Sequence, residues 1–344
     1  MFSSAGIAET YFKDIGLDTI VANELLIKRA NLYSNLNPDT IVINGDITNK
    51  NIKKKILDNS DNINYLIATP PCQGVSRAGK NHNLTDMIND ERNYLIFHVI
   101  EIIHKKKPDY ILIENVPRFL DLLLPYKNKL LPIKDILTKE FSTYYNIEIE
   151  ILDSSDFGVA QKRLRSIIKL YKKNLTWAWP IRNEKKISVY EAISHLPSLE
   201  SNQKSDIPWH YARKHIEKHI LWMKNTPTGK SAFENEIYYP KKENGERIKG
   251  YKATYARMSW DEPAPTITMR NDAISSQRNV HPGRKLNDGT FSDARVLTPL
   301  ELMILTSLPS NWNIPKDTPE TLIRQCLGEC VPPLLIKKIM NNIG

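Results

Sequence analysis

Cysteine is scarce in this chain, which has only three among 344 residues: Cys72, Cys326 and Cys330. An odd and sparse set argues against a disulfide framework and favours a reducing compartment. No CxxC pair or Cys/His cluster has the spacing of zinc ligands. The sequence therefore predicts neither disulfides nor a structural metal.

Long apolar runs are also missing. No stretch approaches the roughly 20 apolar residues that a membrane-spanning helix needs. The first residues do not form a basic segment followed by an apolar run, which is the pattern of a secretory signal. Hydrophobic residues at 41% and charged residues at 25% are ordinary for a globular protein. We therefore expect a cytoplasmic protein with no membrane partner.

Acidic residues are fewer than basic residues. The 48 Lys and Arg residues outnumber the 39 Asp and Glu residues, which leaves a formal net charge of +9. Such an excess suits a polyanionic partner, because cations that contact phosphates release counterions and give sequence-independent affinity. The charge alone is equally consistent with a basic surface that binds no nucleic acid.

The first half of the chain alternates short apolar runs with amphipathic stretches. Residues 40–44, 65–68 and 110–113 are predicted to form buried strands, and residues 94–103 a helix. This alternation is typical of an α/β fold with a parallel sheet. Ligands bind such sheets beyond the carboxyl ends of the strands, so the polar residues there are the first candidates for a site.

The second half has a different character. Residues 172–256 are rich in Lys, Asn, Pro, Trp and Tyr and show little periodicity. Helical patterning returns at residues 300–308 and 331–339. The length allows one large domain and a smaller one, which we place at 1–175 plus 305–344 and at 176–304.

Cys72 lies in the segment ATPPCQGVS, residues 68–76, directly after a predicted strand. It should therefore begin a loop over the carboxyl edge of the sheet. A loop cysteine between Pro-Pro and Gln-Gly suits a reactive thiol, although free cysteines are among the most buried residue types.

Two further segments contain candidate catalytic residues. Glu114 in IENV ends a strand, where a carboxylate can act as a general acid or simply cap a helix. In QKRLR, residues 161–165, Arg163 and Arg165 would share one face of a strand. Two guanidinium groups on one face can hold an anionic or carbonyl-bearing substrate; a solvated basic edge is the alternative.

These three segments resemble the cytosine-C5 DNA methyltransferase family in their order and spacing. The resemblance continues in RMSWDEPAPTIT, residues 257–268, and in GECVPP, residues 328–333. It spans nearly the whole chain except about 172–256. It implies a Rossmann-like, S-adenosylmethionine-dependent methyltransferase sheet with a smaller, irregular DNA-recognition domain.

The same resemblance implies a mechanism. Cys72 would attack carbon 6 of cytosine as a thiolate, which requires a lowered thiol pKa. Glu114 would donate to N3, and Arg165, with Arg163 less directly, would bind the base and favour the thiolate. Carbon 5 would then accept the methyl group. The target base must be flipped out of the duplex, because these atoms are unreachable inside it.

The resemblance also predicts a cofactor site. Phe2 would stack near the adenine, Glu24 would bind the ribose hydroxyls and Asp46 would contact the adenine amino group. The full set of residues predicted to bind S-adenosylmethionine is Phe2, Gly6, Glu24, Asp46, Ile47, Pro70, Glu329 and Val331.

The chain departs from the family pattern at its first residues. Ser4 replaces the first glycine of the cofactor turn, and Phe2 follows Met1 directly where the family has a preceding strand. Without that strand, we expect a gap in the sheet, because both neighbouring strands lose a hydrogen-bond ladder.

Double-stranded DNA is the expected partner of a monomer. The residues expected to contact it lie in the unmatched stretch and are Trp209, His210, Arg213, Lys214 and Lys230. A restriction-modification system is the usual context of a compact member of this family. Two alternatives remain open: a tRNA cytosine-5 methyltransferase of the same fold, and a DNA-binding protein that has lost catalysis.

Overall fold

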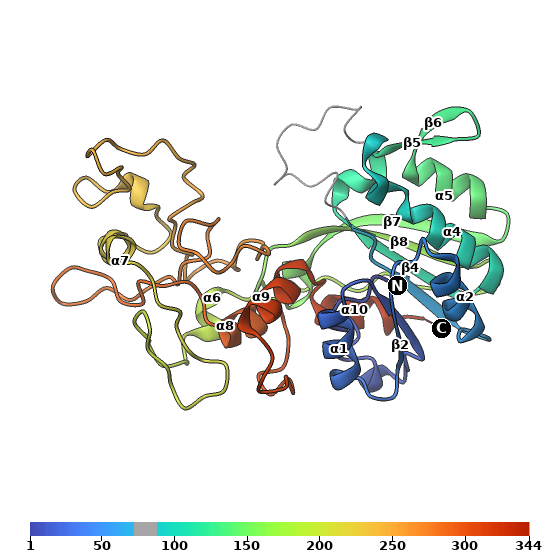
Figure 1. Ribbon diagram of the computed structural model, residues 1–344, viewed down its shortest axis with the longest axis horizontal. Coiled ribbons are helices and arrows are strands. Elements are labelled where there is room, and N and C mark those ends of the chain that lie inside the picture. Colours follow the sequence, from blue (N-terminus) through green and yellow to red (C-terminus); the bar gives the residue numbers. More distant parts are fainter. Residues whose placement is uncertain (72–87, 344) are drawn as a thin grey trace. The chain divides into compact units, whose positions relative to one another are not determined.

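The computed structural model describes residues 1–71 and 88–343. The chain forms two compact units that interleave in sequence (Figure 1). The first contains residues 1–153, 164–181 and 336–344, and the second contains residues 154–163 and 182–335. Across the described residues, no helix has both the length and the apolar character needed to cross a bilayer.

The first unit alternates strands and helices, as the sequence predicts. Its elements are β1 (Val21–Glu24), α1 (Ile27–Leu36), β2 (Ile41–Asn44), α2 (Lys50–Asp58), β3 (Tyr65–Ala68), α4 (Leu95–Lys106), β4 (Tyr110–Asn115), β5 (Leu123–Tyr126), β6 (Lys129–Pro132), α5 (Ile133–Phe141), β7 (Tyr145–Asp153) and β8 (Leu164–Lys172). Helix α10 (Pro333–Met340) runs from the second unit into the first.

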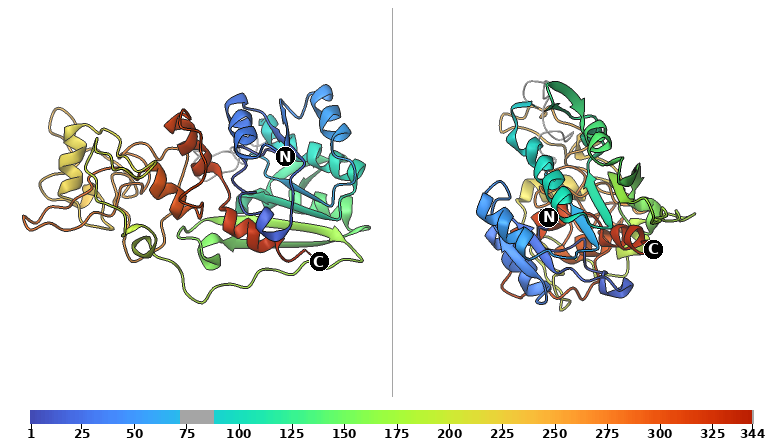
Figure 2. Two further views of the ribbon diagram at one scale, coloured as in Figure 1. Left: turned by 90° about the horizontal axis from the view of Figure 1, so that it is seen from below. Right: turned by 90° about the vertical axis from the view of Figure 1, so that its right-hand side faces the viewer.

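The α/β fold class is confirmed, and the sheet is parallel where the sequence predicts it. Strand β1 pairs with β2, and β3 pairs with β4, both in parallel. The later strands β8 and β7 extend the β3–β4 ladder in antiparallel order. Figure 2 shows β7 and β8, in green, running together as the long strands of this layer. The short strands β5 and β6 form a separate hairpin.

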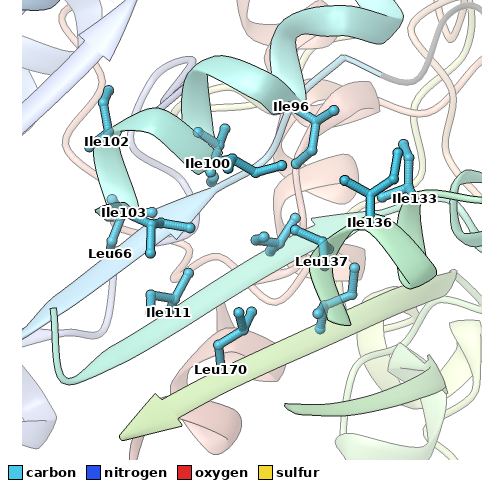
Figure 3. Close-up of a cluster of buried hydrophobic side chains, with 14 of the residues drawn as sticks. Leu66, Ile96, Ile100, Ile102, Ile103, Ile111, Ile133, Ile136, Leu137 and Leu170 are labelled. Atoms are coloured by element: carbon cyan, nitrogen blue, oxygen red, sulfur yellow. The ribbon is translucent and has the colours of Figure 1, made fainter. Parts of the chain in front are cut away.

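A dense apolar core fixes the sheet against its helices. In α4, the buried residues Ile96, Val99, Ile100 and Ile103 recur at helical spacing and form one apolar face. Figure 3 shows isoleucine and leucine side chains of α4 and α5 packed over β4 and β8. All six residues of β4 are buried, so Glu114 sits at the end of a strand that has little freedom to move.

The sheet of the first unit is interrupted between β1 and β3. In the described residues each of these strands is hydrogen-bonded on one side only, β1 to β2 and β3 to β4. A cavity of about 580 Å³ lies there, lined by Val21 of β1, by Tyr65, Leu66 and Ile67 of β3, and by Ile102 of α4. We refer to this cavity as the β1–β3 groove.

The first residues of the chain bridge both edges of the β1–β3 groove. The Met1 amino group donates to the Ile67 carbonyl at 2.7 Å, and the Ser3 amide donates to the Asn23 carbonyl at 3.0 Å. Burial lowers the pKa of the Met1 amino group below its ordinary value. Residues 1–3 thus form backbone hydrogen bonds to both β1 and β3. An additional parallel strand would form such bonds along the whole length of the groove.

The second unit has little regular structure. Its α-helices are α6 (Val189–Ile193), α7 (Glu217–Lys224), α8 (Pro299–Leu305) and α9 (Glu320–Glu329). The helical patterning at 300–308 and 331–339 corresponds to α8 and α10, whereas α6, α7 and α9 were not predicted. The remaining chain is largely irregular, so many of its buried carbonyls need partners other than a sheet.

Buried arginines supply those partners. Arg163, Arg257, Arg295 and Arg324 are among the largest fully buried side chains of the protein. Arg257 donates to the carbonyls of Met223 and His281, at 2.9 and 2.7 Å. Because a guanidinium group has five N–H donors and no acceptor, one side chain can satisfy several carbonyls at once. These residues therefore stabilise a unit that lacks a sheet ladder.

The β1–β3 groove generates a stability prediction. A short apolar β-strand fused ahead of Met1 should pair with both open edges and remove the buried ammonium charge. Each buried backbone group that gains a partner contributes about 1 to 3 kcal/mol, which corresponds to a rise of several degrees in melting temperature. Calorimetry should show this rise over the 344-residue chain, and a Gly/Ser extension of equal length should not reproduce it. Equal melting temperatures for all three proteins would show that the groove does not accept a strand.

Candidate active site

An ion pair joins two of the predicted catalytic residues. The Arg165 Nε atom lies 2.8 Å from Oε1 of Glu114. Glu114 is the penultimate residue of the buried strand β4, and Arg165 is the second residue of β8. The two strands are neighbours in the sheet (Figure 1). Only 8% of the Glu114 side chain and 12% of the Arg165 side chain are exposed. In such surroundings a charge persists only when it is paired, so each side chain fixes the other.

The residue after Glu114 connects β4 to the segment that leads to Cys72. The Asn115 side chain donates from Nδ2 to the Pro70 carbonyl at 2.9 Å, and its Oδ1 accepts the Val116 amide. From β8, the Ser166 hydroxyl donates to the Asn115 carbonyl at 3.1 Å. Asn115 thereby holds the end of β3 beside the Glu114–Arg165 pair. Cys72 itself lies outside the described residues.

Arg163 is placed differently from the sequence prediction. Strand β8 begins at Leu164, so Arg163 and Arg165 do not share a strand face, and that prediction is wrong. Arg163 is buried and donates to the carbonyls of Ile267, Gly328 and Glu329 at 2.9, 3.1 and 2.9 Å. Its guanidinium group therefore positions backbone, and we expect no direct contact with a base.

Arg163 also explains why three of the sequence blocks occur together. Gln161 forms a parallel bridge with Ala264, and its Oε1 accepts the Ile267 amide at 3.1 Å. At Gly328 a Cβ atom would lie 2.4 Å from backbone atoms of Thr268, so only glycine permits this approach. Residues 161–163 thus meet the blocks at 257–268 and 328–333 within the second unit.

The last of these blocks contains Glu329 and Val331, two predicted cofactor residues. Glu329 ends α9, and Arg163 binds its carbonyl group. Val331 is buried. Both belong to the second unit, and their contact with a cofactor stays a prediction.

At the carboxyl end of β1, Glu24 caps the turn that contains Phe2 and Gly6. Its Oε2 accepts the Ser4 amide at 2.8 Å, and its Oε1 accepts the Leu26 amide at 2.9 Å. The turn contains three residues with positive φ: Phe2 at +59°, Ser4 at +47° and Gly6 at +73°. At Gly6 a Cβ atom would lie 2.7 Å from Asn37 Nδ2, so the family's second glycine is retained for a steric reason.

The ends of β2 and β3 are tied to the same region. Asn23 donates from Nδ2 to the carbonyls of Ile43 and Gly45, which fixes the chain just before Asp46. The Thr69 hydroxyl donates to the Phe2 carbonyl at 3.1 Å, which fixes Phe2 beside the end of β3.

The remaining predicted cofactor residues of the first unit differ in exposure. Asp46 is exposed and its Oδ1 accepts the Thr48 amide, whereas Ile47 and Pro70 are buried. Three exposed apolar residues, Leu25, Leu26 and Ile27, follow Glu24 directly. Apolar side chains next to a carboxylate suit a ligand that combines a flat ring with hydroxyl groups.

Sequence reasoning missed the positioning residues Asn115 and Ser166. Asn115 belongs to the IENV segment, but nothing in the sequence reveals that its side chain reaches Pro70. No cluster of three or more His, Cys, Asp or Glu side chains in residues 1–71 and 88–343 is arranged to hold a metal ion.

Comparison with known proteins finds similar sequences and similar structures. A family model described as C-5 cytosine-specific DNA methylase matches residues 1–344. The chain is 57% identical over 345 residues to the Type II methyltransferase M1.HgaI of Avibacterium volantium, which covers 100% of this chain and 96% of the relative. It is 27% identical to the Type II methyltransferase M1.HphI of Haemophilus parahaemolyticus, over 100% of this chain and 85% of that one.

Two solved structures share the fold. One is a prophage-encoded protein of E. coli described as a DNA modification methyltransferase, with a TM-score of 0.72 and 19% identity over 99% of this chain and 96% of that one. The other is a DNMT2 mutant of Spodoptera frugiperda, with a TM-score of 0.59 and 19% identity over 98% and 96%. With the family model matching every residue, the chain belongs to the C-5 cytosine-specific DNA methylases.

Proposed function

We propose that the chain transfers a methyl group from S-adenosylmethionine to carbon 5 of a cytosine that is flipped out of a specific duplex sequence. The observation that carries this proposal is the buried Glu114–Arg165 pair at the carboxyl edge of the sheet, tied through Asn115 to the segment that precedes Cys72. The 57% identity to a Type II methyltransferase supports a role as the modification enzyme of a restriction-modification system.

Carbon 5 of cytosine is a weak nucleophile, and covalent catalysis overcomes this. The Cys72 thiolate adds to carbon 6, and the C5–C6 electrons become available at carbon 5. Carbon 5 then accepts the methyl group, and S-adenosylhomocysteine remains as the second product. Loss of the carbon 5 proton to a base re-forms the double bond and breaks the C6–sulfur bond, so Cys72 is regenerated.

Glu114 and Arg165 serve the addition step. Negative charge develops at the base when the thiolate adds. Glu114 stabilises this charge once its carboxylate has taken up a proton from water, because the protonated group can donate to N3. Arg165 fixes the Glu114 carboxyl group through the 2.8 Å contact and supplies positive charge for the base carbonyl. Arg163 acts less directly, because it positions the backbone blocks of the second unit.

The residues at the ends of β1 and β2 fit S-adenosylmethionine, which supplies the electrophilic methyl group when it is bound. Glu24 lies where ribose hydroxyls are bound in nucleotide-binding sheets, and Phe2, Leu25 and Leu26 offer apolar surface for the adenine. Asp46 is exposed and available to the adenine amino group. Ile47, Pro70, Glu329 and Val331 complete the proposed cofactor set.

The direct test is methyl transfer from labelled S-adenosylmethionine to DNA and, in parallel, to tRNA. Label should appear in DNA at carbon 5 of cytosine. Cys72→Ser should lower this activity by at least about 10³-fold, because a hydroxyl is a far weaker nucleophile than a thiolate. Cofactor binding, measured by calorimetry, should remain close to wild type. Labelling confined to tRNA would contradict the proposed substrate, and substantial turnover by Cys72→Ser would remove Cys72 from its role.

A second prediction concerns Glu114. Glu114→Gln should reduce the maximal methylation rate by about 10² to 10⁴-fold, because the amide holds the base edge but cannot deliver a proton. Glu150→Gln is the matched control, because Glu150 of β7 and Glu114 of β4 pair with the same residue of β8, Ile167, from opposite sides. Its rate should stay near wild type. Equal rates for the two variants would show that Glu114 has only a structural role.

A further inference from the structure

A hairpin projects from the second unit at residues 237–252, which we call the basic hairpin (gold in Figure 1). Lys241 and Arg247 form an antiparallel bridge. The Ile248 amide donates to the Pro240 carbonyl at 2.9 Å, and the Lys242 amide donates to the Glu246 carbonyl at 2.8 Å. Gly245, with φ +86°, makes the turn between the two arms.

The base of the basic hairpin is held in place by its own side chains. Arg247 stacks on the Tyr239 ring at 3.6 Å and donates to the carbonyls of Phe233 and Asn235 at 2.8 and 3.2 Å. At Gly250 a Cβ atom would lie 2.3 Å from the Phe233 ring, so the chain crosses this ring without a side chain. Arg247 is therefore a structural cation of the hairpin.

The surface of the basic hairpin combines positive charge with bare apolar groups. Lys241, Lys249 and Lys252 are exposed. The Tyr251 side chain is 85% exposed and Ile237 is 73% exposed, far more than large apolar residues usually are. The base of this element is held in place, and its large apolar side chains are exposed to water. Both features are typical of a binding surface.

Duplex DNA fits this element better than another protein does. The major groove admits a two-stranded β-ribbon, and its base edges offer both hydrogen-bond groups and thymine methyl groups. Lysines beside the arms can reach phosphates, which position a protein without reading sequence. An exposed tyrosine and isoleucine can contact base edges.

We propose that the basic hairpin enters the major groove and reads part of the target sequence, with Tyr251 and Ile237 contacting bases and Lys241, Lys249 and Lys252 contacting phosphates. This assignment rests on the proposed methylation of DNA. It differs from the sequence expectation, which named Trp209, His210, Arg213, Lys214 and Lys230.

The structure argues against part of that earlier expectation. His210 is buried, its Nε2 contacts the Pro197 carbonyl at 2.9 Å, and its Nδ1 contacts the Thr298 hydroxyl at 3.1 Å. It therefore cannot meet DNA, and that expectation is corrected. Arg213 contacts Glu320 at 3.4 Å. Lys214 and Lys230 are exposed and remain compatible with phosphate contacts.

The test maps methylated cytosines in plasmid DNA after reaction with the full-length enzyme and its variants. Wild type should methylate one sequence context. Tyr251→Ala should relax discrimination at one or two base positions by about 5- to 150-fold, the range of a single side chain–base contact. Ile237→Ala should relax a neighbouring position. Tyr144→Ala, which removes an exposed tyrosine outside the hairpin, should leave the pattern unchanged.

The lysines should behave differently from Tyr251. Lys249→Gln with Lys252→Gln should raise KM for DNA and lower the slope of log affinity against log salt by about 1.8, with the methylation pattern unchanged. Melting curves establish that each variant is folded. A methylation pattern and rate that remain those of wild type in both Tyr251→Ala and Ile237→Ala would overturn the proposal. Absence of DNA methylation by the wild-type enzyme would instead overturn the proposed function on which it rests.

Discussion

The contact on which the proposed chemistry depends is the ion pair between Glu114 and Arg165. Two charged groups are removed from water at the end of a fully buried strand, and each is tolerable there only because the other lies 2.8 Å away. The pairing requires the antiparallel register of β4 and β8, and that register is held by the apolar core beneath α4 and α5. Packing far from the chemistry thus determines where the carboxyl group stands.

The two units use different physical means to hold their backbone. The first satisfies its buried carbonyls through strand ladders, and Glu24, Asp46, Pro70 and Glu114 lie at or just beyond the carboxyl ends of β1, β2, β3 and β4. The second satisfies many of its carbonyls through buried arginines, and Arg163 binds two blocks that are far apart in sequence. An irregular unit stabilised in this way can carry long surface segments such as the basic hairpin, because no sheet register constrains them.

Local patterns predicted the first unit well. The apolar run Tyr65–Ala68 coincides with β3, because a short buried strand is visible as a continuous apolar run that ends at turn residues. The pairing of β4 with β8 was not predictable, because register depends on contacts between residues about 50 positions apart. For the same reason the sequence placed Arg163 beside Arg165 on a strand, and it missed Asn115 as the link to Pro70. His210 looked like a contact to DNA because composition reveals residue type but not burial.

The proposed catalysis depends on a covalent bond between Cys72 and the target base. Duplex DNA synthesised with 5-fluorocytosine tests it directly, because the fluorine on carbon 5 cannot leave as a proton does and the adduct accumulates. Incubation with S-adenosylmethionine should give a complex that survives denaturation, and mass spectrometry of its peptides should place the nucleotide on Cys72. Cys326 and Cys330 serve as internal controls, since both are buried and should remain unmodified. If an active enzyme forms no adduct, or forms it on another residue, Cys72 is not the nucleophile.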